Sequence, residues 1–221
     1  PAAHAATFSR LESRAASWKH TDLAVCCRKY RAIIVDEYGN DKDSALAILD
    51  EGLSLYGSTN SELVRAKAKV LYRSEDHEKS LALSKTLIES DTPLSEVEKA
   101  FLGRDAAISA EKQSDLASAR RYYLYGSDAA KKSKLPDMAA MGVGLLADAA
   151  LASWHEGDRQ TCLQDFVVVL TELMQFAPDE TLRTAHCHAI TRHVLLWLDQ
   201  DVTGDKFALD DGEETKIYPG Y

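Results

Sequence analysis

The chain has 221 residues, of which 45% are hydrophobic and 28% are charged, and its formal net charge is −9 at pH 7. This composition is typical of a folded globular protein, and a sequence pI near 5.3 opposes strong binding to a nucleic-acid backbone. The longest apolar stretch, Met138 to Ala147, is too short to span a membrane, and Pro1 to Trp18 lacks the apolar core of a secretory signal. We therefore expect a cytoplasmic protein.

Apolar residues at helical spacing, interrupted by Gly, Asn, Ser and Pro, predict an all-α chain with ten helices and no strand. Breaks such as Gly39-Asn40, Gly57-Ser58, Pro93 and Pro178 stand where a helix is expected to stop or start. The predicted helices cover residues 3–19, 22–38, 42–56, 60–73, 76–90, 94–112, 115–131, 135–156, 159–177 and 179–199.

An aspartate followed four residues later by a small residue recurs at the start of four of these helices. An Asp at this position accepts hydrogen bonds from free backbone amides and is worth about 0.5 to 2 kcal/mol. The small residue lets a neighbouring helix approach closely. The small residues are spaced by 35, 39 and 43 residues, which is typical of stacked helical hairpins. The pairs are Asp41 with Ala45, Asp76 with Ser80, Asp115 with Ala119, and Asp158 with Cys162.

Small residues also precede each Asp, as in Ala66 with Ala68 and Ala106 with Ala107. Over roughly residues 22–199 the pattern resembles the tetratricopeptide repeat (TPR) family, most clearly through Ala68, Leu71, Ser80 and Leu87 within 62–91. The resemblance implies antiparallel hairpins stacked as a right-handed superhelix with a binding groove. The usual Trp, Gly and Pro are mostly absent and two spacings are long, so the array would be divergent. A non-repetitive helical bundle is the alternative.

The sequence divides into an expected TPR-like domain over 1–199 and an acidic linker or tail over 200–221. Six acidic residues lie between Asp201 and Glu214, against Lys206 and Lys216. Because the chain starts at Pro1 without Met and its last residues have no obvious partner in the repeats, we expect a piece of a longer protein.

In the resembling family, the first helix of each pair lines the groove. Helical spacing places a basic, partly aromatic strip on those helices, opposite the small residues that pack inward. Glu111 and Asp148 fall on the same face. Arg and Lys with nearby aromatics suit an acidic or carboxylate-bearing peptide, although a solvated helix face would look similar. The candidate groove residues are Tyr30, Arg31, Arg65, Lys69, Tyr72, Arg73, Arg104, Trp154 and Arg192.

One specialisation of the family, a two-carboxylate clamp for chaperone tails, needs paired helical Asn residues. The chain has only Asn40 and Asn60, both expected in loops or at a helix edge. The clamp is therefore not expected, and a different peptide or a folded protein surface is favoured.

Other chemistry has little support in the sequence. Gly142-Val143-Gly144 lacks the third glycine and the strand of a phosphate-binding loop. His186 and His188 point to different sides of a helix, and His193 lies two turns from His186, so we expect no metal site and no cofactor. A basic segment, 131–134, could touch phosphates, but it also suits a helix C-terminus.

We therefore predict a non-catalytic module that binds a protein or an acidic peptide, as the scaffold or sensor part of a larger protein. Contacts with other domains of the same parent chain are part of this expectation. The alternatives are a regulatory repeat region of a signalling ATPase, by fold-level analogy, and a nucleic-acid-binding helical protein.

Overall fold

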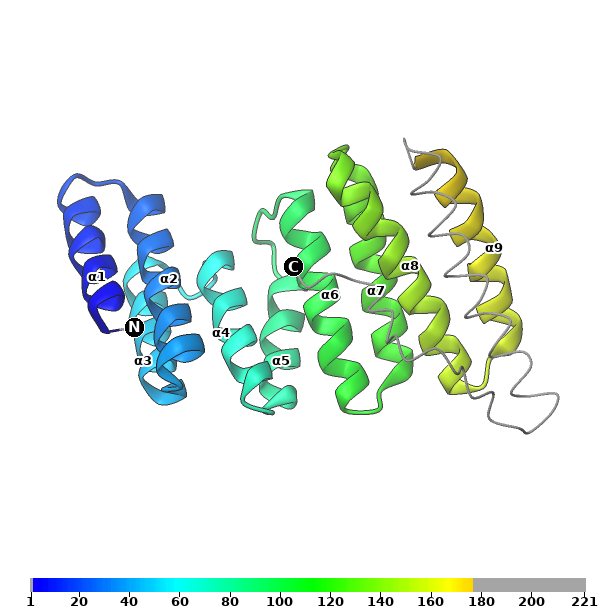
Figure 1. Cartoon of the computed structure of the whole chain (residues 1–221), viewed down its shortest axis with the longest axis horizontal. Coiled ribbons are helices and arrows are strands. Elements are labelled where there is room, and N and C mark those ends of the chain that lie inside the picture. The colour runs from blue at the N-terminus through cyan, green and yellow to red at the C-terminus, as the bar shows by residue number, and fades with distance from the viewer. Residues whose placement is uncertain (1, 177–221) are drawn as a thin grey trace, which may run out of the picture. The chain divides into compact units, whose positions relative to one another are not determined.

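A computed structural model of the protein describes residues 2–176, and over this range it contains nine α-helices and no strand (Figure 1). The helices agree with the first nine predicted from the sequence to within a few residues at each end. The tenth predicted helix, 179–199, and the acidic tail, 200–221, lie outside the described residues. The helices are α1 (Ala2–Ser17), α2 (Thr21–Gly39), α3 (Lys42–Tyr56), α4 (Ser61–Arg73), α5 (His77–Ile88), α6 (Glu96–Lys112), α7 (Leu116–Lys132), α8 (Pro136–Glu156) and α9 (Arg159–Phe176).

Residues 1–165 form one compact unit and residues 166–221 a second, with the division inside α9. In the first unit each of α1 to α7 packs against the helix that follows it, and the helices stand in a row in chain order (Figure 1). In addition, α2 contacts α4, α4 contacts α6, and α6 contacts α8, whereas α3, α5 and α7 do not contact one another. The stack is therefore tighter on the side of the even-numbered helices. We call the side lined by α2, α4, α6 and α8 the even-helix face.

The recurring aspartates are the N-caps predicted from the sequence. Each carboxylate accepts a hydrogen bond from the backbone amide three residues later, which satisfies one of the free amides of the helix start. The donors are the amides of Ser44, Lys79, Ser118 and Thr161, at 3.0, 3.4, 3.1 and 3.0 Å from Asp41, Asp76, Asp115 and Asp158 respectively.

The residue before each of these aspartates has a left-handed backbone, with φ of 51°, 62°, 60° and 92° at Asn40, Glu75, Ser114 and Gly157. This conformation ends the preceding helix, because it lets the Asp amide donate back to a carbonyl of the last turn. The Asp115 amide, for example, donates to the Ala110 carbonyl at 3.0 Å. Of the four left-handed residues, only Gly157 is a glycine. The others adopt this conformation at some cost in strain.

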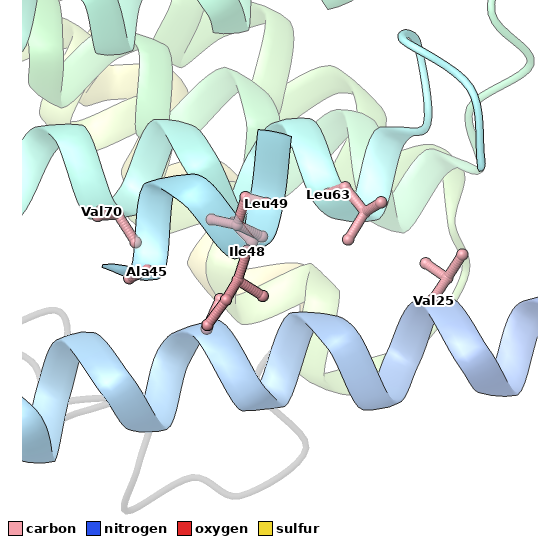
Figure 2. Close-up of a cluster of buried hydrophobic side chains, with 8 residues drawn as sticks. Val25, Ala45, Ile48, Leu49, Leu63 and Val70 are labelled. Atoms are coloured by element: carbon pink, nitrogen blue, oxygen red, sulfur yellow. The ribbon is translucent and has the colours of Figure 1, made fainter. Parts of the chain in front are cut away.

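The small residues that follow the aspartates are all buried, as the sequence predicted. Ala45 and Ala119 are fully buried, and Cys162 and Ser80 nearly so. The Ser80 hydroxyl lies 3.1 Å from that of Ser109, which joins α5 to α6. Larger apolar side chains fill the remaining space; Figure 2 shows Ile48 and Leu49 of α3 between Val25 of α2 and the α4 residues Leu63 and Val70.

The α6–α7 crossing depends on two glycines. A Cβ placed on Gly103 would lie 2.7 Å from both the Cα and the N of Gly126, well inside contact distance. A Cβ on Gly126 would in turn lie 3.0 Å from the Ala100 carbonyl oxygen. Because the opposing atoms are backbone, a side chain at Gly103 could not be accommodated by a rotamer change.

A buried ion pair ties α1 to the next hairpin. Glu12 and Arg28 are each 5% exposed, and the Arg28 Nε donates to Glu12 Oε1 at 2.5 Å. The Arg28 Nη1 also donates to the Ile48 carbonyl at 3.2 Å, and the Tyr56 hydroxyl donates to Glu12 at 3.3 Å. Removing one member would leave its partner charged and buried, so the contact matters for stability.

Candidate functional site

Three of the predicted groove residues lie along one side of α4, on the even-helix face. Arg65, Lys69 and Arg73 are spaced by four residues, which places them about one turn apart. Lys69 and Arg73 are both exposed, at 58% and 38% of their side-chain surface, and Arg65 is half-buried.

Carboxylates of α2 neutralise two of these charges. The Arg73 Nη1 lies 2.6 Å from Glu37 and 3.4 Å from Asp36, and the Lys69 Nζ lies 3.4 Å from Glu37. Burial raises the pKa of Asp36 while the Arg73 charge opposes that rise. The predicted basic strip is therefore partly an ion-pair network between neighbouring even-numbered helices.

Tyr30 and Arg31 face α1. The Tyr30 ring stacks on Phe8 with 5.9 Å between centroids, and the Lys29 Nζ lies 5.0 Å from the same ring. The Arg31 Nη1 lies 3.9 Å from Glu12 of α1. These two predicted residues thus belong to the α1 end of the even-helix face, away from Arg104 and Trp154 in the stack.

Arg65 and Arg104 meet at an aromatic ring that the sequence prediction did not include. The Arg65 Cζ lies 5.3 Å and the Arg104 Cζ 5.1 Å from the centre of Phe101, which is within the range of a cation–π contact. Arg104 also donates to Asp105 at 3.1 Å. Within the described part of the chain, Arg65 has no carboxylate oxygen within 4.0 Å, and its Nε is buried without a hydrogen-bond acceptor.

The two remaining predicted aromatic residues, Tyr72 and Trp154, contact residues that are not among the candidate groove residues. Tyr72 lies against His77 at the start of α5, with ring centroids 5.0 Å apart. Arg159 lies over Trp154, with its Cζ 5.4 Å from the ring centre. Arg192, the last predicted groove residue, lies outside the described residues.

Two carboxylates share the α6–α8 end of the same face. The Tyr123 hydroxyl of α7 donates to Glu111 Oε2 at 2.8 Å, and burial raises the pKa of Tyr123. Burial, together with the Glu111 charge and against the opposing Arg104 charge, raises the pKa of Asp148 to about 7. Helical spacing placed Glu111 and Asp148 on this face, but their burial and mutual repulsion depend on how α6, α7 and α8 pack.

The described residues contain no group of three or more His, Cys, Asp or Glu side chains placed to hold a metal ion. The metal candidates of the sequence, around His186 to His193, lie outside the described residues. Among the helices of residues 2–176, none has the length and apolar character that crossing a membrane requires.

The fold is an all-α array of helical hairpins of the TPR type, divergent in its sequence. It is similar to the solved structure of MamA from Desulfovibrio magneticus RS-1, residues 41 to the end, with a TM-score of 0.51 and 11% identity over 78% of this chain and 96% of that one. A double mutant of MamA RS-1 gives a TM-score of 0.52 at 12% identity, over 80% and 98% of the two chains.

A third similar structure is YrrB, described as a TPR protein with an unusual peptide-binding site; its TM-score is 0.39 at 12% identity, over 79% of this chain and 96% of that one. No family model matches the sequence, and a search of curated proteins finds no match. At identities of 11% and 12%, the structural similarity shows a shared fold and does not show a shared function.

Proposed function

We propose that the chain is a non-catalytic module that binds a peptide or protein along the even-helix face, with Arg65 contacting an acidic group of the partner. The observation that carries the proposal is the state of Arg65. Its Nε is buried without an acceptor, and no carboxylate of the described residues lies within 4.0 Å of it. The half-buried guanidinium therefore lacks a charged acceptor within the described chain, and a carboxylate supplied by a partner would provide one.

The surroundings of Arg65 favour the same ligand chemistry. Phe101 offers apolar area beside the guanidinium, and Arg104 approaches the ring as a second positive charge. Arg binds carboxylate through two parallel hydrogen bonds, and a hydrogen bond to a charged group contributes about 1.5 to 3 kcal/mol. An aspartate, a glutamate or a chain-terminal carboxylate would meet these requirements.

The other proposed contact residues would act as a pre-ordered frame. Lys69 and Arg73 are held by Glu37, and Arg31 by Glu12, so their positions are fixed before a partner arrives. Pre-ordering lowers the entropic cost of binding. A scaffold or sensor role within a larger protein would use this same face, and that part of the proposal rests on analogy between folds.

A random peptide library displayed on phage tests the proposal without the choice of a particular partner. We expect selection on the purified chain to enrich peptides with an acidic residue or a free carboxylate end. The Arg65→Gln variant should weaken binding of a selected, fluorescently labelled peptide by about tenfold or more, as expected for 1.5 to 3 kcal/mol. The affinity of the Arg65→Lys variant should lie between those of the unmodified chain and the Arg65→Gln variant, because Lys keeps the charge and loses the bidentate geometry of Arg.

Lys85→Gln is the matched control, since Lys85 is exposed on α5 and lies off the even-helix face. It should bind the selected peptide like the unmodified chain. Enriched peptides without an acidic preference, or equal binding by the Arg65→Gln variant, would exclude Arg65 as the contact residue.

A further inference from the structure

The even-helix face changes its sign of charge along α6. Arg104 and Glu111 are seven residues apart, so they share one side of this helix and are separated by about 10 Å along its axis. The half-buried Ile108 lies between them. Phe101, which both Arg65 and Arg104 approach, lies one turn before Arg104. The face is therefore positive near the middle of α6 and negative at its end.

The negative end consists of Glu111 and of Asp148 from α8, the helix that contacts α6 on this face. The Tyr123 hydroxyl donates to Glu111 at 2.8 Å, which fixes one carboxylate. Burial and the Glu111 charge raise the pKa of Asp148, so the two carboxylates repel each other. Within the described part of the chain, no Lys, Arg or His nitrogen lies within 4.0 Å of either one.

The nearest cations along the two helices lie away from these carboxylates. Lys112 follows Glu111 directly, so it projects about 100° around α6, and it is exposed. His155 is also exposed and lies about 10 Å, or two turns, beyond Asp148 on α8. A cation supplied by a partner and placed between the two carboxylates would offset their repulsion.

The positive end has carboxylates nearby, but none of those described forms an ion pair with Arg65. Glu98 accepts a hydrogen bond from the Ser61 hydroxyl at 2.6 Å and lies beyond 4.0 Å from the Arg65 guanidinium. Asp105 pairs with Arg104, its neighbour on the same helix, at 3.1 Å. The two ends of the strip therefore complement opposite charges on a partner.

We propose that the peptide bound along the even-helix face carries an acidic group at Arg65 and a basic side chain, Lys or Arg, between Glu111 and Asp148. This inference rests on the function proposed for Arg65 and specifies the ligand further. Phe101 and Arg104 precede Glu111 by ten and seven residues, which corresponds to about 10 to 15 Å along α6. In an extended peptide that lies along α6, the acidic and basic residues are then about three to five positions apart.

Phage selection on three forms of the chain separates the two charges. The probe is the random peptide library, and the baits are the unmodified chain, Arg65→Gln, and the double variant Glu111→Gln with Asp148→Asn. We expect the unmodified chain to enrich peptides with an acidic residue and a Lys or Arg about three to five positions away. The Arg65→Gln bait should lose the acidic preference, and the double variant should lose the basic one.

Fluorescence anisotropy with one selected, labelled peptide gives the magnitude. Replacing its basic residue with Gln should weaken binding to the unmodified chain about fivefold or more, and binding to the double variant less than twofold. Glu89→Gln with Asp128→Asn is the matched control, because it removes two exposed carboxylates away from the even-helix face. The control should keep the full effect of the peptide substitution. Circular dichroism checks that both variants stay folded.

The outcomes distinguish this inference from the function proposed for Arg65. An acidic preference without a basic one would overturn this inference alone, as would a basic preference that persists on the double variant. The bait is the whole 221-residue chain, so any segment of it that already neutralised the two carboxylates would also leave no basic preference. A basic preference without an acidic one would overturn the function proposed for Arg65 and, with it, the paired charges. No enrichment on the unmodified chain would overturn both.

Discussion

Replacing Asp148 with Asn should stabilise the protein at high pH and leave its stability nearly unchanged at low pH. The Asp148 side chain is largely buried near Glu111, and its pKa is raised from 3.8 to about 7. Between these two pH values the folded chain binds the proton that the unfolded chain has released. Stability from this group is therefore fully present near pH 4 and is lost as the pH rises to about 7.

The size of the effect follows from the shift. Each pKa unit corresponds to about 1.4 kcal/mol, so three units set an upper limit of about 4 kcal/mol above pH 7. Because the side chain keeps some contact with water, we expect about 2 to 4 kcal/mol at pH 8. Asn is neutral at every pH and keeps nearly the shape of the protonated Asp, so Asp148→Asn should remove this loss.

Urea denaturation followed by circular dichroism between pH 4.5 and 8.5 measures the difference in unfolding free energy. The difference between Asp148→Asn and the unmodified chain should grow as the pH rises to about 7 and level off above it. Asp128→Asn is the control, since Asp128 is exposed and pairs with Lys132 at 2.6 Å, and its effect should stay small throughout. A constant difference for Asp148→Asn across this range would refute the placement of a raised carboxyl pKa at this junction of helices.

Three further substitutions test the packing. Gly103→Ala should cost about 3 kcal/mol or more in urea denaturation, because its Cβ meets backbone 2.7 Å away. Gly39→Ala should be neutral or slightly stabilising, because its Cβ would meet only the Ile34 carbonyl oxygen, at 4.0 Å. Ser114→Gly should stabilise the chain by about 0.5 to 1 kcal/mol and so raise its thermal midpoint, since it relieves a left-handed residue at φ 60°; a lower midpoint would contradict the strain. Glu12→Gln should cost about 1.5 to 3 kcal/mol, because the buried Arg28 would keep only the exposed Glu51, 3.0 Å from its Nη1, as a carboxylate partner; no measurable cost would exclude a structural role for the pair.

Helix capping could be predicted from the sequence because it is local. Asp115 and the amide it caps are three residues apart, so a pattern of residue types is enough to identify them. The break at Gly39-Asn40 was predicted, but the left-handed residues Glu75 and Ser114 were missed, because neither is the glycine or asparagine that usually marks such a turn.

The charge state of the even-helix face could not be predicted in the same way. Helical spacing put Lys69 and Arg73 on one side of α4, but their partner Glu37 comes from α2, and its register depends on how the two helices cross. Phe101 was missed for the same reason, because its role beside Arg65 arises only when α4 and α6 are neighbours. Periodicity identifies a face of a helix and leaves the contacts across it to the packing.

The aspartate turns also have a consequence for how the array can be rearranged. A single residue closes the helix behind it through its amide and opens the helix ahead through its carboxylate, so these turns hold the two helices of a hairpin with no spare length. The connections between hairpins, residues 57–60, 89–95 and 133–135, vary from three to seven residues. The connections between hairpins therefore tolerate changes in length. We expect insertions and grafted loops to be accepted there and to disrupt the fold at the aspartate turns.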